Sequence, residues 1–244
     1  MAEPTLLAAV GEVGKDFFQE RSSDTLPCQA TDKLFCFDWA RENIDRYGTP
    51  TVQHVELVVL SVLAGFAIAF ALALLAHRRR WLQPPLLAAT GVLYTIPSVA
   101  FFFLLLPVTG RGRDTAIVAL TAYTLQIIYR NAMVGLANVP ASVKDAARGM
   151  GLTERQILWR VELPLATPEI VAGLRIATVS TVAIATLAVF AGGGGLGSVI
   201  KSQITFKTNI VIAGGIAILL AIAFDAILYG IQRFATPWRR AASA

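Results

Sequence analysis

Charged residues are scarce in this sequence. Lys, Arg, Asp and Glu together make up 15% of its 244 residues, whereas hydrophobic residues make up 55%. Soluble globular domains carry about 25% charged residues, so the composition argues against a soluble enzyme. A disordered chain is excluded too, because such chains contain few apolar residues. The mean hydropathy of +0.62 indicates that lipid surrounds most of the folded protein.

Histidine and cysteine are also rare, with two of each. His54 and His77 stand at the two ends of one apolar run, and no Cys/His cluster has the spacing of a metal site. Two isolated histidines do not make a catalytic triad. We therefore expect no catalytic residue, no metal site and no cofactor bound by this chain. Cys28 and Cys36 lie close together in the N-terminal part, where they form either a disulfide or two free thiols.

The glycine-rich residues 192–197 contain G-x-G-x-x-G and G-x-x-x-x-G only because glycine repeats there. A P-loop has Lys directly after its last glycine, whereas Ser198 follows Gly197 here. A dinucleotide-binding loop follows a strand, whereas an apolar membrane span precedes this run. The pattern therefore argues against a nucleotide site and favours a mobile turn over an ordinary loop.

Long apolar segments are what the sequence has in abundance. A helix needs about 20 apolar residues to cross the hydrocarbon core, and backbone groups in lipid must pair within their own segment. The segments are too continuous for barrel strands. We predict an all-α polytopic membrane protein with about five transmembrane helices, the second broken at Pro97. The predicted spans are residues 55–76, 86–106, 115–137, 168–191 and 209–232.

The charges are distributed unevenly along the chain. Residues 1–56 hold 5 Lys/Arg and 10 Asp/Glu, a net charge of −5, and residues 57–244 hold 16 and 6, a net charge of +10. A basic protein can bind nucleic acid, but these basic residues lie between apolar runs, as expected for membrane orientation. We expect no nucleic-acid partner. With five spans, three basic groups fall on one side, which we take as cytoplasmic: Arg78, Arg79 and Arg80; Lys144, Arg148, Arg155 and Arg160; Arg233, Arg239 and Arg240.

This orientation divides the chain into three parts. Residues 1–54 form an extracytoplasmic N-terminal tail, residues 55–233 the transmembrane domain, and residues 234–244 a cytoplasmic tail. No cleavable signal sequence is apparent at the N-terminus. Part of the tail is expected to be an amphipathic helix on the membrane surface, with one apolar face made of Leu6, Leu7, Val10, Val13, Phe17 and Phe18.

Two features within the spans could have a functional role. Arg175 and Asp225 are charges inside or close to apolar runs, where burial is costly. A structural role is favoured over a functional one for both. The break at Pro97 could expose a pathway for solute lined by Tyr94, Ser98 and Phe101, because aromatic faces attract quaternary ammonium groups. The alternative is that these aromatic residues pack only against helices or lipid.

The cytoplasmic segment 139–166 is too patterned for a simple loop. Ser142 and Asp145 have the spacing of a capping box, which predicts a short helix ending near Gly151. Thr153 and Gln156 form a second capping box, and Pro164 should end the helix that follows. The predicted unit is two short helices around a glycine corner. The alternative is an amphipathic helix pair lying on the inner leaflet.

The same segment resembles the EAA signature of ABC importer permeases, which reads E-A-A-x3-G-x9-I-x-L-P. Every spacing matches, with Asp in place of Glu and Val in place of Ile. Further stretches, around Pro97, Arg175 and residues 194–197, resemble the subfamily that imports glycine betaine, carnitine and choline. The resemblance covers roughly residues 50–232. It assigns the following residues to a coupling helix: Asp145, Ala146, Ala147, Gly151, Val161, Leu163 and Pro164.

The resemblance implies a type I ABC importer permease of the bacterial inner membrane, with the N-terminus outside and the C-terminus in the cytoplasm. Its partners would be a dimeric ATP-binding cassette ATPase, which holds ATP and Mg²⁺, an extracytoplasmic substrate-binding protein, and a second permease copy or a sister permease. Small residues in the coupling helix would let its backbone approach the ATPase closely. Alternatives are a permease for an amino acid, bile acid or related solute, a secondary transporter, and an intramembrane enzyme, for which no residue set is found.

Overall fold

The computed structural model describes residues 34–236, and within this range the chain is helical with no strand. The short elements at one end are α3 (Phe37–Glu42) and the 3-10 helix η1 (Ile44–Tyr47), and α11 (Leu196–Ser202) joins them there. The expected amphipathic helix at Leu6 to Phe18 lies outside the described residues. The other principal helices are α4 (Gly48–Arg78), α5 (Gln83–Thr95), α6 (Ser98–Thr109), α7 (Arg113–Ala137), α8 (Ala141–Gly149), α9 (Glu154–Ile157), α10 (Leu163–Ala185) and α12 (Lys207–Ala235).

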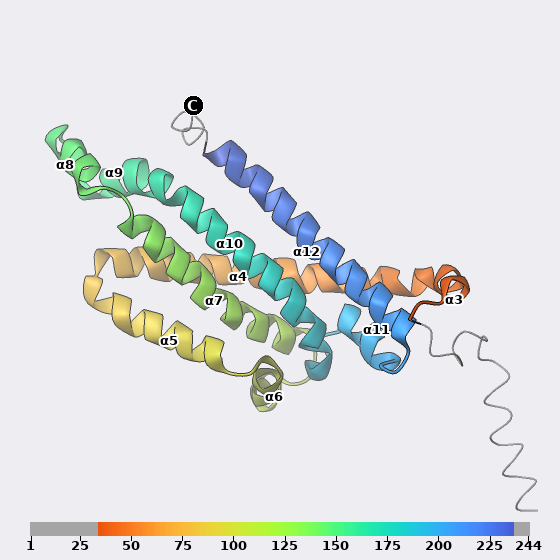
Figure 1. The fold of residues 1–244 in the computed structure, drawn as a ribbon. Coiled ribbons are helices and arrows are strands. Elements are labelled where there is room, and N and C mark those ends of the chain that lie inside the picture. Colours follow the sequence, from red (N-terminus) through yellow and green to blue (C-terminus); the bar gives the residue numbers. More distant parts are fainter. Residues whose placement is uncertain (1–33, 237–244) are drawn as a thin grey trace, which may run out of the picture.

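The centre of the bundle is α7, which packs most extensively against α4 and α10 (Figure 1). Small residues allow this close approach. A Cβ on Gly65 of α4 would lie 1.7 Å from Oγ1 of Thr124, and one on Gly173 of α10 would lie 2.4 Å from Cβ of Asn131. Glycine at both positions therefore lets the outer helices contact α7 through their backbones.

Three helical stretches are long and apolar enough to cross a membrane on their own: Ile44–Arg78, Glu154–Ala191 and Lys207–Ala235. Helices α5 and α6 reach a fourth crossing only as a bent pair. The predicted third span is α7, which falls outside this group because it carries polar residues. These are satisfied inside the bundle: Oγ1 of Thr90 lies 2.5 Å from Oε1 of Gln126, and Nδ2 of Asn131 donates to the Ile127 carbonyl oxygen. A central helix surrounded by protein can be less apolar than one that faces lipid.

The predicted second span, 86–106, is broken at Pro97 as predicted, and the break is sharper than a kink. Its two halves, α5 and α6, meet at an angle of 100°. Ile96 and Pro97 both have extended backbone angles, with ψ of 128° and 130°. Proline disfavours the helical region for the residue before it and donates no helical hydrogen bond, so the helix stops completely instead of bending.

Pro164 does not end a helix, contrary to the prediction. Helix α9 continues through a five-residue π-helical segment, η3 (Leu158–Glu162), into α10, and the whole stretch Glu154–Ala191 is one continuous helix. Pro164 is the second residue of α10. In a π-helical turn each backbone N–H bonds to the carbonyl five residues earlier instead of four. This change falls directly before Pro164, which has no N–H to donate. The predicted fourth span therefore begins well before residue 168 and extends out of the bundle.

The end of the bundle that holds α3 and α11 is closely packed. The backbone N–H of Cys36 donates to Oγ1 of Thr208, and the Tyr47 hydroxyl donates to Oδ1 of Asn209. Helix α4 begins at Gly48, so the first transmembrane helix starts earlier than the predicted residue 55. Cys28 lies outside the described residues, and a bridge between Cys28 and Cys36 stays a prediction.

The glycine run at residues 192–197 is also packed at this end. A Cβ on Gly197 would lie 1.7 Å from the carbonyl oxygen of Thr186, in the 3-10 helix η4 (Thr186–Ala191) that follows α10. The N–H of Gly195 donates to Oε1 of Gln53 at 3.2 Å. These contacts give the run a packing function in addition to that of a turn.

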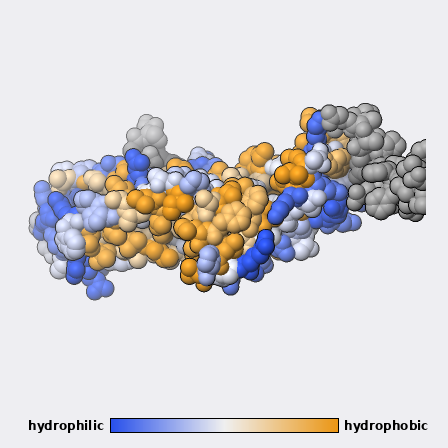
Figure 2. Space-filling model, turned by 90° about the horizontal axis from the view of Figure 1, so that it is seen from below, coloured by the Kyte–Doolittle hydropathy of each residue, from blue (hydrophilic) through white to orange (hydrophobic). Residues whose placement is uncertain are grey.

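The surface reflects this architecture. In Figure 2, apolar residues gather across the middle of the molecule and polar residues at its two ends. Of the three helical stretches long enough to cross a membrane, α12 is the most exposed, with 11% of its apolar part buried. An exposed apolar face of this length is what a membrane-spanning helix presents to lipid or to another subunit.

Candidate coupling site

Helices α8 and α9 project together from one end of the bundle (Figure 1). The corner between them is built on Gly151, whose φ of +82° is left-handed. The N–H of Gly151 donates to the carbonyl oxygen of Arg148 and the N–H of Leu152 to that of Ala147, at 2.9 and 3.2 Å. These two bonds make a Schellman motif, which closes α8 and reverses the chain. The predicted glycine corner is therefore confirmed.

The second predicted capping box is confirmed and the first is wrong. The N–H of Gln156 donates to Oγ1 of Thr153, and the N–H of Thr153 donates to Oε1 of Gln156. Helix α8 has no such cap, because it starts at Ala141, with Pro140 in the N-cap position. Ser142 is already inside the helix, where its hydroxyl cannot reach the free N–H groups as a capping residue does.

Arg148 links the two helices across the corner. Its guanidinium lies 3.0 Å from Oδ1 of Asp145 in α8 and 2.9 Å from Oε1 of Glu154 in α9. The carboxylate of Glu154 is the main cause that raises the pKa of Arg148 above its usual value. The side chains are exposed, so this pair contributes little to stability, but it fixes the relative direction of α8 and α9.

Glu162 connects this unit to the rest of the bundle. Its side chain is 8% exposed, and its two oxygens lie 3.1 Å from Nζ of Lys144 in α8 and 2.8 Å from Nε2 of His77 at the end of α4. A carboxylate this buried is stable only with such partners. Three segments far apart in sequence, residues 77, 144 and 162, are thereby joined at one carboxylate.

The predicted coupling residues divide into an exposed and a buried group. Asp145, Ala146 and Gly151 are exposed, and Val161 and Pro164 are half-buried. Ala147 and Leu163 are buried at 1% and 8% exposure.

The reasons for small side chains therefore differ along the motif. Ala147 is small because it packs within this chain, and Gly151 is required for its positive φ, since a Cβ there would meet nothing within 4 Å. Of the two alanines, only Ala146 is exposed. Leu163 packs in the core with Ala73, Tyr129 and Ala166 and anchors the motif to the bundle.

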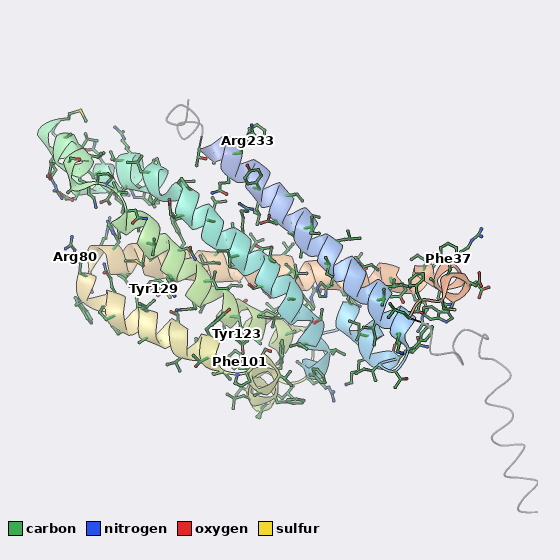
Figure 3. All side chains as sticks on the ribbon, viewed as in Figure 1. Phe37, Arg80, Phe101, Tyr123, Tyr129 and Arg233 are labelled. Carbon is green, nitrogen blue, oxygen red and sulfur yellow. The ribbon has the colours of Figure 1, made fainter. Side chains whose placement is uncertain are left out.

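The second predicted site lies where α5, α6 and α7 meet. Figure 3 shows Phe101 of α6 beside Tyr123 of α7. The Tyr123 ring centroid is 5.6 Å from that of Phe101 and 6.0 Å from that of Tyr94, both edge-to-face. The Tyr123 hydroxyl donates to the Ile96 carbonyl oxygen, left free by the break at Pro97.

Of the four predicted pathway residues, Tyr94 and Pro97 are exposed, Ser98 is half-buried and Phe101 is buried. A cavity of about 420 Å³ lies beside Tyr94, lined also by Gln126, Ile127, Arg130, Asn131 and Val134. The described residues thus offer an aromatic wall with one open face next to a cavity lined by both polar and apolar side chains. Phe101 supports that wall from behind and does not line the cavity.

Arg175 and Asp225 form a bidentate pair between α10 and α12, with N–O distances of 2.8 and 2.7 Å. Gln232 extends it by accepting from Arg175 and donating to the Pro168 carbonyl oxygen. The guanidinium also lies 5.0 Å from the Tyr229 ring centroid. This arrangement supports the structural reading, because α12 has few other polar contacts with α10 in the described residues.

Sequence reasoning missed the groups that join the coupling unit to the bundle: Lys144, Arg148, Glu154, Glu162 and His77. One signal was available. Glu162 lies between two apolar residues of the motif, Val161 and Leu163. A charged side chain in such a position is expected to be buried, and a buried charge needs a partner. The identity of the partners depends on the fold, since His77 is 85 residues away.

These features define a helical membrane protein with one projecting unit, formed by α8 and α9 (Figure 1). Residues 61–240 match the family described as the binding-protein-dependent transport system inner membrane component, and the chain belongs to this family. Among its relatives is the osmoprotectant import permease protein OsmW of Salmonella typhimurium, 36% identical over 80% of this chain and 94% of the relative. The choline transport system permease protein OpuBB of Bacillus subtilis is 33% identical over 77% of this chain and 87% of the relative.

Solved structures show the same fold. The inward-facing MetNI methionine ABC transporter matches with a TM-score of 0.61 and 24% identity over 73% of this chain and 93% of the other. An amino acid ABC transporter with histidines matches with a TM-score of 0.67 and 19% identity over 81% of this chain and 98% of the other. The type I ABC importer permease fold is therefore confirmed, and a secondary transporter is no longer a competing interpretation.

Proposed function

We propose that this chain is the translocating subunit of an ATP-driven importer for a compatible solute such as glycine betaine, choline or carnitine. The relatives named above import osmoprotectants or choline, and they are more similar in sequence than the amino acid transporters, which share the fold alone. The observation that carries the proposal is the exposed α8–α9 corner, rigid in itself and tied to α4 and α10 through Glu162.

The coupling step follows from this geometry. A separate ATPase would contact the exposed part of α8, around Asp145, Ala146 and Met150, which is 74% exposed. Because α8 and α9 are locked by the Gly151 corner and by Arg148, a displacement of α8 moves both helices as one unit. Since α9 is continuous with α10 and Glu162 holds the end of α4, the displacement would reach two membrane-spanning helices directly.

The orientation belongs to the proposal as well. The described basic residues of the three predicted cytoplasmic groups lie toward one end of the bundle, where Figure 3 labels Arg80 and Arg233, while Phe37 lies toward the other. Lys and Arg are retained on the cytoplasmic side during insertion. We therefore place α8 and α9 in the cytoplasm, the C-terminus on the same side and residues 1–54 outside.

The transported solute would pass beside α5, α6 and α7. The exposed face of Tyr94 could meet a quaternary ammonium group by cation–π attraction, which contributes about 0.5–2 kcal/mol. A second permease copy or a sister subunit would complete the wall, because the cavity beside Tyr94 is open on one side. A binding protein would deliver the solute from outside.

Reconstitution tests this proposal. The chain is co-expressed with a candidate ATPase and a candidate binding protein from the same organism, and the complex is placed in vesicles. ATP hydrolysis should rise when solute-loaded binding protein is added, and choline, glycine betaine or carnitine should compete for uptake while methionine does not. Failure to co-purify with any ATPase would refute the coupling role; competition by methionine alone would refute the substrate class.

A further inference from the structure

Two cavities meet at the end of α4, below the coupling corner. One, of about 600 Å³, is lined by Leu74, Leu75, Arg78, Arg155, Leu158 and Trp159. The other, of about 550 Å³, shares Arg78, Arg155 and Leu158 and is otherwise lined by His77, Arg80, Lys144, Arg148, Glu154 and Glu162. An apolar groove and a charged pocket thus have a common wall that contains two arginines.

The positive charges in this wall are not neutralised by the protein. Lys144 is paired with Glu162 and Arg148 with Glu154. Within residues 34–236, no ion pair is formed by Arg78, Arg80 or Arg155, so no carboxylate lies within 4.0 Å of their nitrogen atoms. The charged pocket also holds the carboxylates of Glu154 and Glu162, but both are paired with other groups. The guanidinium groups of Arg78, Arg80 and Arg155 therefore leave an excess of positive charge in this space.

The adjacent groove is placed where an acyl chain would lie. Leu74 and Leu75 belong to the last turns of the membrane-spanning stretch Ile44–Arg78. Leu75 is 43% exposed and Trp159, on the π-helical segment, is 53% exposed. Exposed tryptophan is typical of the membrane interface. The apolar groove therefore begins at headgroup level and runs along α4 toward the hydrocarbon core.

We propose that this composite cavity binds one anionic phospholipid, with its phosphate between Arg78 and Arg155 and an acyl chain against Leu75, Leu158 and Trp159. Guanidinium groups bind phosphate oxygens in a bidentate manner, and basic pockets at the cytoplasmic side of membrane helices bind anionic headgroups. A free phosphate would not use the apolar groove, whereas a zwitterionic lipid would bring a cationic headgroup into a pocket that already has an excess of positive charge. The bound lipid would bridge α4 and the coupling unit formed by α8 and α9.

The test measures lipid binding by the purified full-length chain in neutral detergent, using native mass spectrometry and thermal unfolding. Phosphatidylglycerol should bind and raise the unfolding temperature, and phosphatidylcholine or inorganic phosphate at the same concentration should not. Each arginine near an anionic surface contributes about a fivefold gain in affinity, so the R78Q/R155Q variant should bind phosphatidylglycerol roughly thirtyfold more weakly.

The matched control is R41Q/R111Q, which removes two exposed arginines at the opposite end and should leave lipid binding unchanged. The R78K/R155K variant retains the charges and should bind more tightly than R78Q/R155Q. Equal binding of phosphatidylcholine, equal binding of inorganic phosphate, or unchanged phosphatidylglycerol binding by R78Q/R155Q would each overturn the site. A loss in R78K/R155K as large as in R78Q/R155Q would also overturn it, because the charge would then not be the cause.

Discussion

The two ends of the bundle are held together by different interactions. At the α8–α9 end, charged groups dominate: Glu162 accepts from His77 and Lys144, and Arg148 bridges two carboxylates. At the α3–α11 end, neutral hydrogen bonds such as Tyr47 to Asn209 combine with close backbone packing around Gly197.

This difference corresponds to the tasks we assign to the ends. At the α3–α11 end, the helices pack closely against one another, so any displacement there would lose packing contacts. The α8–α9 end touches the bundle mainly through one carboxylate and the continuous helix into α10, so it can move as a unit. Substitutions at the first end should therefore change stability, and those at the second should change coupling more than stability.

The largest effect on stability is expected for Gly197→Ala. The added Cβ would lie 1.7 Å from the Thr186 carbonyl oxygen, and because the neighbour is backbone it cannot move aside. Thermal unfolding in detergent should show a loss above about 3 kcal/mol. Gly214→Ala is the control, since a Cβ there meets nothing within 4 Å. Equal stability of the two variants would show that the glycine run is not tightly packed.

A smaller loss is expected for Glu162→Gln. Glutamine keeps the shape but removes the charge that Lys144 and His77 share, which should cost about 2 kcal/mol of stability and most of the solute-stimulated ATP hydrolysis. Glu56→Gln is the matched control: it breaks an exposed pair with Arg113 of 3.0 Å and should cost less than about 0.5 kcal/mol. If the control lost as much stimulation, the distinction between the ends would not hold.

Gly151→Val should separate stability from coupling most clearly. A β-branched residue at a φ of +82° costs about 1–2 kcal/mol, absorbed locally because the corner is exposed. The complex should assemble and hydrolyse ATP without uptake. Gly149→Ala, two residues away and at a normal φ, should transport normally. Unchanged uptake by Gly151→Val would contradict the assignment of the corner.

The smallest effect is expected for Asp225→Asn between α10 and α12. The side chains of Arg175 and Asp225 are 25% and 40% exposed, and Gln232 and Tyr229 remain as partners of Arg175. A polar contact between membrane helices contributes about 0.6 kcal/mol. A double-mutant cycle with Arg175→Gln measures the coupling energy; a value above the loss for Glu162→Gln would indicate a functional charge pair.

The sequence was informative where the signal is local. Apolar runs located the helices that cross or line the membrane, the spacing of Thr153 and Gln156 predicted the cap of α9, and Gly151 predicted the corner. Each of these depends on a few neighbouring residues and on backbone geometry, so tertiary structure had little to add.

The sequence did not predict how the chain continues around its prolines. Pro164 follows a π-helical segment and does not terminate the helix, and the predicted break at Pro97 is a sharp turn of 100°. The partners of Glu162 come from α4 and α8, and no sequence period connects them. Proline shows that regular structure must change nearby, but the surrounding helices determine how.

The most direct test of the account is photo-crosslinking from each end in the assembled transporter. A photoreactive amino acid replaces Met150, 74% exposed at the coupling corner, or Ile204, 66% exposed beside α11. The account predicts that the ATPase subunit is crosslinked from position 150 and not from position 204. Crosslinking of the ATPase from position 204, with none from position 150, would contradict it.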